Sequence, residues 1–232
     1  MRIGILAHSF PSAFALHKAV AKIPGQEVFI ILSPPPHRSA WTSYLANLAR
    51  LVQTSLKGFD SKPFQLLLAR RLVQLRRPLH HVQSVETLKK LNLDVGFHKA
   101  GVIYRDVTIN AFRLGILNHH IGILPAYRGR SVMEWSILQG DPAGITVFFI
   151  DSGIDTGPRI VLSEHVDVSS YSSITAAKQY LFSLDSVFFP KALSLINNSA
   201  PTFQLNDGSG KRYFVMSKLF EGVVEQLLKA RN

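Results

Sequence analysis

Three polar side chains in the second half of the chain have types and spacing suited to acid–base chemistry. Asn118 and His120 stand at the end of an apolar run, and Asp155 lies in a glycine-rich turn. Side chains two residues apart in a strand share a face, so Asn118 and His120 point to one side and His119 to the other. An amide that donates a hydrogen bond and an imidazole that donates or moves a proton can together stabilise an oxygen atom gaining negative charge.

Asp155 completes this group if its turn lies beside the strand that ends at His120. A carboxylate next to an imidazole orients the ring, and it can also take a proton from an amine nucleophile. A purely structural interpretation stays open, in which Asn118 caps a strand and His120 is a buried, paired histidine. We expect His119 to be a packing residue and Asp151 to form a turn.

Alternating strands and helices must position these residues. Apolar runs predict buried strands at residues 2–7, 28–32, 94–97, 115–119, 145–150 and 160–163. Helical spacing predicts helices at residues 12–23, 85–91, 133–138, 174–196 and 219–229, with Ser84 as an N-cap and an interruption at Pro190. This order is typical of an α/β fold with a parallel sheet, in which ligands bind at the carboxyl ends of the strands.

Residues 37–78 interrupt the alternation, and we interpret them as a basic helical hairpin inserted after the second strand. Between Ser33 and Lys90 the sequence holds ten lysines and arginines but only Asp60 and Glu86 as acids. The arginines of this hairpin could be solvated, could cover an anionic acceptor, or could contact tRNA phosphates. A membrane-surface contact through residues 41–77 is a further alternative, because basic amphipathic helices bind lipid surfaces.

Composition limits the class of protein. The 232 residues are 47% hydrophobic and carry a net charge of +11, which favours anionic partners. We expect one domain at residues 1–200 and a C-terminal extension at 201–232. The absence of cysteine excludes disulfides and zinc sites with sulfur ligands. No apolar run is long enough to span a membrane or to act as a signal peptide, so we expect a cytoplasmic protein.

The candidate site residues belong to four pieces of sequence in a fixed order. These are Asn118-x-His120, Leu124-Pro125-x-Tyr127-Arg128-Gly129, Gly144-Ile145-Thr146-Val147 and Asp151-x-Gly153-x-Asp155-x-Gly157-Pro158. Together they resemble the formyltransferases that use 10-formyltetrahydrofolate, a family that includes methionyl-tRNA formyltransferase, glycinamide ribonucleotide transformylase and amino-sugar N-formyltransferases. The resemblance covers residues 94 to about 163. It implies a Rossmann-like fold, a mostly parallel sheet with helices on both faces.

The resemblance also implies roles for individual residues. Asn118, His120 and Asp155 would be catalytic, with 10-formyltetrahydrofolate as co-substrate. Residues that would border this folate are Phe97, Lys99, Gly101, Val102, Ile103, Ile150, Asp151 and Gly153. Residues that would bind the acceptor are Tyr127, Arg128, His8 and Ser9, with loop stabilisation as the alternative for Arg128. We expect no metal site, because the histidines lack carboxylates at ligand spacing.

Departures from the family pattern narrow the expected acceptor. His8-Ser9-Phe10-Pro11-Ser12 replaces the glycine-rich phosphate loop of glycinamide ribonucleotide transformylases. The residues after 200 are too few for the barrel of methionyl-tRNA formyltransferases. By elimination we expect a small anionic acceptor, a nucleotide-linked amino sugar. The alternatives are a methionyl-tRNA formyltransferase without the barrel, a formyltetrahydrofolate hydrolase, and a basic RNA- or protein-binding module without activity. Residues 219–229 could support a homo-oligomer.

Overall fold

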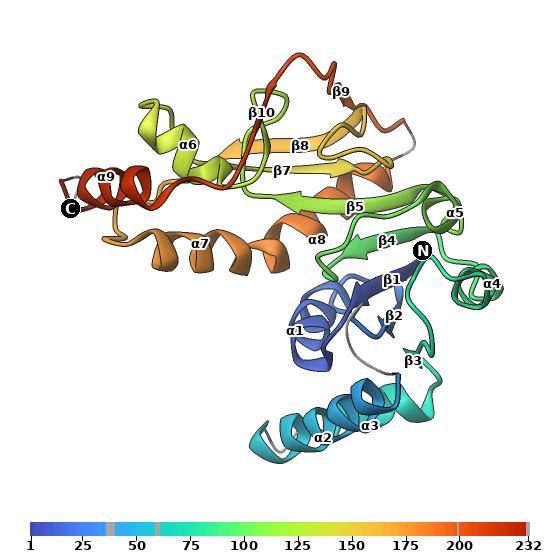
Figure 1. Cartoon of the computed structure of the whole chain (residues 1–232). Coiled ribbons are helices and arrows are strands. Elements are labelled where there is room, and N and C mark those ends of the chain that lie inside the picture. Colours follow the sequence, from blue (N-terminus) through green and yellow to red (C-terminus); the bar gives the residue numbers. More distant parts are fainter. Residues whose placement is uncertain (36–39, 59–60, 199, 231–232) are drawn as a thin grey trace. The chain divides into compact units, whose positions relative to one another are not determined.

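The computed structural model describes residues 1–35, 40–58, 61–198 and 200–230 (Figure 1). It divides the chain into two compact units, Met1–Leu117 and Asn118–Asn232. The expected boundary at residue 200 stays a prediction. Residues 37–39 and 59–60 of the predicted insertion lie outside the described residues, as do residues 231–232 of the predicted extension.

Unit 1 is built on a parallel sheet with strand order β3-β2-β1-β4-β5. The strands are β1 (Arg2–Ala7), β2 (Glu27–Leu32), β3 (Leu72–Gln74), β4 (Val95–His98) and β5 (Gly115–His120), which continues past the end of the unit. In the centre of the sheet Ile5 is in register with Ile30 on one side and Phe97 on the other. Strands β1 and β2 are almost wholly buried, as expected for strands covered on both faces. The predicted α/β fold with a mostly parallel sheet is confirmed.

The helices of unit 1 are α1 (Phe10–Val20), α2 (Ala40–Gly58), α3 (Lys62–Leu68), α4 (Val82–Lys90) and α5 (Asp106–Ile109). The chain steps from β1 to β2 in one direction and later from β3 to β4 in the other. Because such crossovers are right-handed, α1 and α4 lie on opposite faces of the sheet (Figure 1). The direction in which strands are added to the sheet reverses between β1 and β4. In α/β proteins such a reversal leaves a crevice at the carboxyl ends of the two strands, where ligands bind.

The predicted helical hairpin over residues 37–78 is not confirmed as a single insertion. Helices α2 and α3 do follow β2, but the chain then forms β3, which pairs in parallel with β2. Main-chain bonds fix this strand: Ile30 N–H donates to Arg71 O at 2.8 Å, and Leu75 N–H to Leu32 O at 2.8 Å. The apolar residues of such a short segment suit a helix and a strand equally, so hydrogen bonding to β2 decided its conformation.

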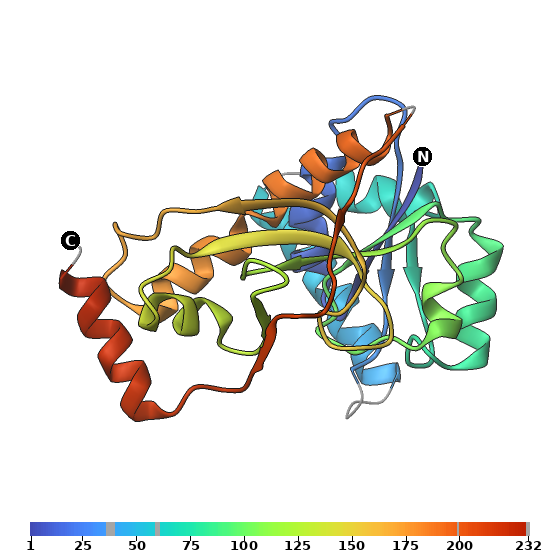
Figure 2. The same cartoon turned by 90° about the horizontal axis from the view of Figure 1, so that it is seen from above.

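Unit 2 holds three antiparallel strands and a two-stranded ribbon. Its elements are β6 (Tyr127–Gly129), α6 (Val132–Leu138), β7 (Gly144–Phe149), β8 (Arg159–His165), α7 (Ile174–Ser183), α8 (Asp185–Ile196), β9 (Gln204–Leu205), β10 (Lys211–Tyr213) and α9 (Lys218–Ala230). Strands β7, β8 and β9 are antiparallel neighbours, and β10 pairs in parallel with β6. Figure 2 shows the C-terminal segment running from β9 across the unit to β10 and α9.

The predicted helix at residues 174–196 is two helices, but the break is at Leu184 and not at Pro190. Leu184 N–H donates to Leu181 O at 3.2 Å, which tightens and ends α7. Phe188 N–H then donates to Leu184 O at 2.8 Å, and α8 continues through Pro190. In α4 the N-cap is His81 rather than the predicted Ser84, and its ring accepts a hydrogen bond from Gln83 N–H.

None of the helices in the described part of the chain combines the length and the hydropathy that crossing a membrane requires.

Candidate active site

His120, the last residue of β5, has hydrogen-bond acceptors next to both ring nitrogens. Its Nε2 atom lies 2.8 Å from the main-chain oxygen of Tyr127, and its Nδ1 atom lies 3.6 Å from Oδ1 of Asp155. A carbonyl oxygen only accepts, so Nε2 carries a proton and donates it. Nδ1 is therefore the ring nitrogen that faces the Asp155 carboxylate. The ring is buried and packs edge-on against Phe148.

The alternation of β5 separates the two neighbouring histidines. Asn118 is half-buried and shares the strand face of His120. His119 points the other way and packs against Phe188 and Phe189 of α8, with ring centroids 5.8 and 6.0 Å away. The packing role expected for His119 agrees with these contacts. The structure thus brings His120 and Asp155 together at the end of β5, with Asn118 two residues earlier on the same strand face.

Asp155 is held in a left-handed conformation, with φ of 53°, in the turn after β7. Its Oδ2 atom accepts a hydrogen bond from Gly129 N–H at 3.0 Å. Its main-chain oxygen accepts one from Nδ2 of Asn206 at 3.1 Å, and the same Nδ2 atom donates to Gly157 O at 3.1 Å. Sequence reasoning missed Asn206, because nothing in the polar tail that contains it indicates a contact with residue 155.

The remainder of this turn is stabilised by Asp151. Its Oδ1 atom accepts hydrogen bonds from Gly153 N–H at 3.0 Å and from the Thr156 hydroxyl at 2.8 Å. A Cβ atom on Gly157 would lie 1.8 Å from the main-chain oxygen of Phe149, so only glycine fits there. Asp151 forms the turn, as expected, and its contact with a folate stays a prediction, as does that of Gly153. Ile150, just before the turn, packs against a buried apolar cluster.

Tyr127 contributes its main chain to the site. Its ring stacks on Tyr213 with centroids 5.3 Å apart, and its hydroxyl donates to Asp141 and lies 3.0 Å from Oε1 of Gln139. Burial and the Asp141 carboxylate raise the pKa of the Tyr127 hydroxyl well above its ordinary value. The structure therefore gives this side chain a packing role, and its contact with an acceptor stays a prediction. Arg128 donates to Gly208 O at 3.3 Å, consistent with loop stabilisation.

The loop after β5 is fixed to β7 by Thr146. The buried Thr146 hydroxyl donates to Gly122 O at 2.7 Å and accepts from Leu124 N–H at 3.1 Å. A Cβ atom on Gly122 would lie 2.9 Å from Nε2 of His120, so glycine lets the loop pass close to the ring. Thr146 thereby positions the chain that supplies the Tyr127 carbonyl to His120.

Unit 1 has a cavity of about 340 Å³ at the carboxyl ends of β1 and β4. His8 follows β1, and Gly101, Val102, Ile103 and Tyr104 follow β4, and all of them line this cavity. The cavity lies at the reversal of strand order, and its volume is in the range of small-molecule sites. It brings together one predicted acceptor-binding residue and three predicted folate-binding residues.

The other predicted residues of unit 1 have different surroundings. Phe97 is fully buried in β4, so its side chain belongs to the core. Lys99 follows β4, and its N–H donates to Leu6 O at 2.8 Å. Ser9 shares a hydrogen bond with the Ser12 hydroxyl at the start of α1. His8 is fixed by Ser33, whose main-chain oxygen lies 2.9 Å from Nδ1 of His8.

A metal centre would need several ligands in one place. Within residues 1–35, 40–58, 61–198 and 200–230, no three histidine, aspartate or glutamate side chains gather closely enough to hold a metal ion.

The strand order of unit 1 defines an α/β protein of Rossmann-like topology, and unit 2 places an imidazole–carboxylate pair at a strand end. The model of the formyl transferase family matches residues 63–193, more than half of the chain. The chain belongs to this family, as its sequence motifs predicted.

Curated relatives of the chain include methionyl-tRNA formyltransferases. The protein of this name from Nitrosospira multiformis is 30% identical over 201 residues, which are 84% of this chain and 59% of that protein. The relative from Chloroflexus aggregans is 30% identical over 154 residues, 66% of this chain and 50% of that protein. The chain thus spans less than two thirds of the length of these relatives.

Solved structures share the fold at low sequence identity. A 4-N formyltransferase from Francisella tularensis has a TM-score of 0.62 and 15% identity, and the match covers 98% of this chain and 87% of that chain. The formyltransferase PseJ from Anoxybacillus kamchatkensis, solved in complex with UDP-4,6-dideoxy-4-formamido-L-AltNAc and tetrahydrofolate, has a TM-score of 0.55 and 17% identity, with 100% of both chains covered. These matches confirm the Rossmann-like fold.

Proposed function

We propose that this protein transfers a formyl group from 10-formyltetrahydrofolate to a primary amine. The observation that carries the proposal is the His120 ring, held between the Tyr127 carbonyl and the Asp155 carboxylate with Asn118 on the same strand face. Membership of the formyl transferase family supports it. The cavity of unit 1 supports it as well, because a pocket of about 340 Å³ has room for a flat ring system of the folate kind.

The proposed reaction exchanges one carbon–nitrogen bond for another. 10-Formyltetrahydrofolate supplies the formyl group, and the acceptor amine forms a bond to the formyl carbon while the bond from that carbon to N10 breaks. Asn118 donates a hydrogen bond to the formyl oxygen as it gains negative charge, and protonated Nδ1 of His120 does the same. The acceptor nitrogen loses one proton, which Asp155 accepts, and N10 of the leaving tetrahydrofolate gains one.

The environment of the pair explains why these residue types suit the reaction. The bond from Nε2 to the Tyr127 carbonyl fixes the orientation of the ring, so Nδ1 is the nitrogen presented for proton exchange. The bond from Gly129 N–H to Oδ2 leaves Oδ1 of Asp155 facing the imidazole. Because both side chains are largely shielded from water, hydrogen bonds to a developing charge are strengthened there.

For the acceptor we propose a small anionic amine, a nucleotide-linked amino sugar. The match to PseJ over the whole of both chains supports this choice, since that protein was solved with a UDP-linked formamido sugar. Methionyl-tRNA is the second candidate, favoured by the 30% identity to the Nitrosospira protein. The net charge of +11 is compatible with either anion. A cytoplasmic location and self-association stay predictions.

One assay separates these possibilities. The purified chain is incubated with 10-formyltetrahydrofolate and, in parallel, with a UDP-linked 4-amino sugar, with methionyl-tRNA, or with no acceptor. We expect formamide formation and equimolar tetrahydrofolate with the amino sugar. Formylated methionyl-tRNA would instead select the second candidate, and formate without any acceptor would indicate a hydrolase. Absence of all three products, with RNA binding retained, would contradict the enzymatic proposal and favour a binding module.

A further inference from the structure

Helix α2 packs against the rest of unit 1 mainly through polar residues and turns a stripe of large apolar residues to solvent. The residues on its inner side are Ser43, Asn47, Leu51 and Ser55, which recur every four positions and are buried. The outward stripe recurs at intervals of three or four and consists of Trp41, Leu45, Leu48, Val52 and Leu56. Trp41 is 75% exposed and Leu56 is 71% exposed. An ordinary surface helix has the opposite orientation, with the apolar stripe facing the core.

Asn47 fixes this orientation. Its Oδ1 atom accepts a hydrogen bond from Phe10 N–H at 3.2 Å, and its Nδ2 atom donates to Gln74 Oε1 at 3.3 Å and to His8 O at 3.4 Å. In the described part of the chain, the Ser43 and Ser55 hydroxyls are buried without a hydrogen-bond partner. Burying such groups while exposing a leucine stripe is unfavourable, so we infer that the stripe is covered by something outside unit 1.

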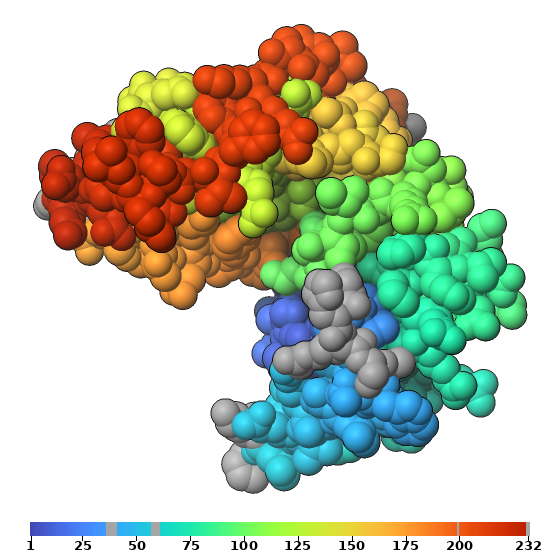
Figure 3. Space-filling model, in the orientation of Figure 1, coloured from blue at the N-terminus to red at the C-terminus, as the bar shows by residue number. Residues whose placement is uncertain are grey.

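The stripe adjoins α3. Leu48 of α2 and Leu67 of α3 line one small hollow, and Leu67 is itself exposed. In Figure 3 the two helices form part of the outer surface at the lower end of the view. We call the five stripe residues together with Leu67 the α2–α3 apolar face. From Trp41 to Leu56 it extends over about 22 Å of helix, so a surface rather than a pocket-sized ligand is needed to cover it.

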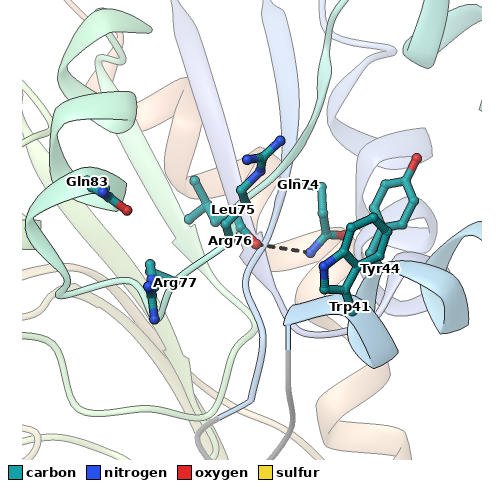
Figure 4. Close-up of a pocket in the computed structure, with 7 residues that line it drawn as sticks. All are labelled: Trp41, Tyr44, Gln74, Leu75, Arg76, Arg77 and Gln83. Atoms are coloured by element: carbon teal, nitrogen blue, oxygen red, sulfur yellow. Dashed lines mark hydrogen bonds between the residues drawn. The ribbon is translucent and has the colours of Figure 1, made fainter.

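Positive charge borders the aromatic end of this face. Trp41 and Tyr44 share a hollow of about 660 Å³ with Arg76 and Arg77, which follow β3 (Figure 4). The two aromatic rings are 6.2 Å apart and edge-to-face, and both arginines are exposed. Asp60 is the only acidic residue in the sequence between Ser33 and Val85. The segment of chain that carries the apolar face and its bordering arginines is therefore strongly cationic.

We propose that the α2–α3 apolar face docks on an anionic lipid bilayer. Leucine and valine side chains of the stripe would enter the acyl boundary, and Trp41 and Tyr44 would lie at headgroup depth, where aromatic residues concentrate. Arg76 and Arg77 would contact lipid phosphates. A second copy of the chain fits less well, because two such faces would bring their basic borders together. This inference is independent of the proposed reaction.

Vesicle co-sedimentation of the full chain tests the proposal. We expect binding to phosphatidylcholine vesicles that contain about 30 mol% phosphatidylserine, and binding at least about tenfold weaker to phosphatidylcholine alone. Leu48→Glu/Val52→Glu should lower partitioning to the anionic vesicles by at least about tenfold. Leu219→Glu/Val223→Glu is the matched control, because these exposed residues have the same spacing on α9 and the charge change is equal. It should bind within about twofold of the wild type.

Fluorescence and charge reversal give independent readouts. The chain has two tryptophans, so Trp135→Phe leaves Trp41 as the sole reporter, and its emission should shift to the blue with anionic vesicles. Arg76→Glu/Arg77→Glu should weaken binding by about tenfold or more, whereas Lys22→Glu/Lys89→Glu, which change exposed lysines elsewhere in unit 1, should have a smaller effect. The proposal fails if the wild type does not sediment with anionic vesicles and Trp41 emission does not shift. The proposal would also be overturned if the wild type formed a dimer that Leu48→Glu/Val52→Glu abolished. The same holds if the chain bound an acidic protein and no vesicles.

Discussion

The side-chain amide of Asn206 donates a hydrogen bond to the main-chain oxygen of Asp155, 51 residues earlier in the sequence, at 3.1 Å. The same nitrogen donates to Gly157 O, and Asn206 N–H donates to Pro158 O at 2.9 Å. Asn206 is almost wholly buried. The segment after residue 200 therefore helps to define the position of the candidate catalytic carboxylate.

Asn206→Leu should lower kcat for formyl transfer by about tenfold, because the turn that carries Asp155 loses the two hydrogen bonds that the Asn206 side chain donates to it. The KM for 10-formyltetrahydrofolate should change much less. Asn197→Leu, at the exposed end of α8, serves as control and should leave kcat unchanged. Steady-state kinetics of the two variants provide the measurement, and equal kcat values for both would remove Asn206 from a positioning role.

Asn118→Ala and His120→Ala should each lower turnover by about 100-fold or more, since each removes a donor to the formyl oxygen. Asp155→Asn should also reduce turnover, because an amide cannot accept the amine proton. His119→Leu is the control, as its side chain lies on the opposite strand face against Phe188. Single-turnover rates with saturating acceptor check these expectations. A His120→Ala variant with near-normal turnover would contradict the proposed mechanism.

The stability of the protein should fall as the pH is lowered, through His17. Burial, and secondarily the charges of Arg71 and Lys62, lower the pKa of His17 from 6.5 to about 4. Between these values the unfolded chain binds a proton that the folded chain does not, so stability rises with pH across this window and is lost as pH falls. The loss between about pH 7.5 and pH 5 should amount to about 2 kcal/mol.

Urea unfolding of the wild type and of His17→Leu at both pH values checks this expectation. The variant should lose most of the pH dependence that His17 contributes, whereas His165→Leu, at an exposed position, should retain it. Identical pH dependence in the wild type and His17→Leu would show that His17 is charged or solvated in the folded protein.

Lys178→Met should destabilise the protein by about 3 kcal/mol, because it leaves a buried carboxylate without its partner. Lys178 Nζ donates to Oε1 of Glu134 at 2.7 Å, and Glu134 is 1% exposed. Within the described residues, Oε2 of Glu134 has no hydrogen-bond partner. Lys191→Met is the matched control, since it breaks an exposed pair with Glu164 and should cost less than about 1 kcal/mol.

The double variant Glu134→Leu/Lys178→Met should recover much of the lost stability, because it removes the buried charge together with its partner. Denaturant midpoints at constant m-value report the comparison. If Lys178→Met lowered the free energy of unfolding no more than Lys191→Met does, water would have to reach Glu134.

The sequence by itself determined the longer buried strands, the family and the order of the candidate catalytic residues. Buried strands of β-branched and apolar residues have a strong local signal, and β1, β2, β4, β5 and β7 appear within one residue of the predicted ranges. That Asn118 and His120 share a strand face could be predicted without the tertiary structure, because a strand places alternate residues on one face. The turn between Gly153 and Gly157 could also be predicted from the sequence, because glycine and aspartate favour turns.

Only the tertiary structure decided the contacts between distant segments. The His120 ring bonds to the Tyr127 carbonyl, and the Asn206 side chain bonds to the Asp155 carbonyl. The sequence around these residues predicts neither contact. The short β3 became a strand because β2 offered its main-chain hydrogen bonds, which local periodicity does not encode. The outward stripe of α2 follows from the anchoring of Asn47. Local patterns fix which face of an element is apolar, but the packing of neighbouring elements decides where that face points.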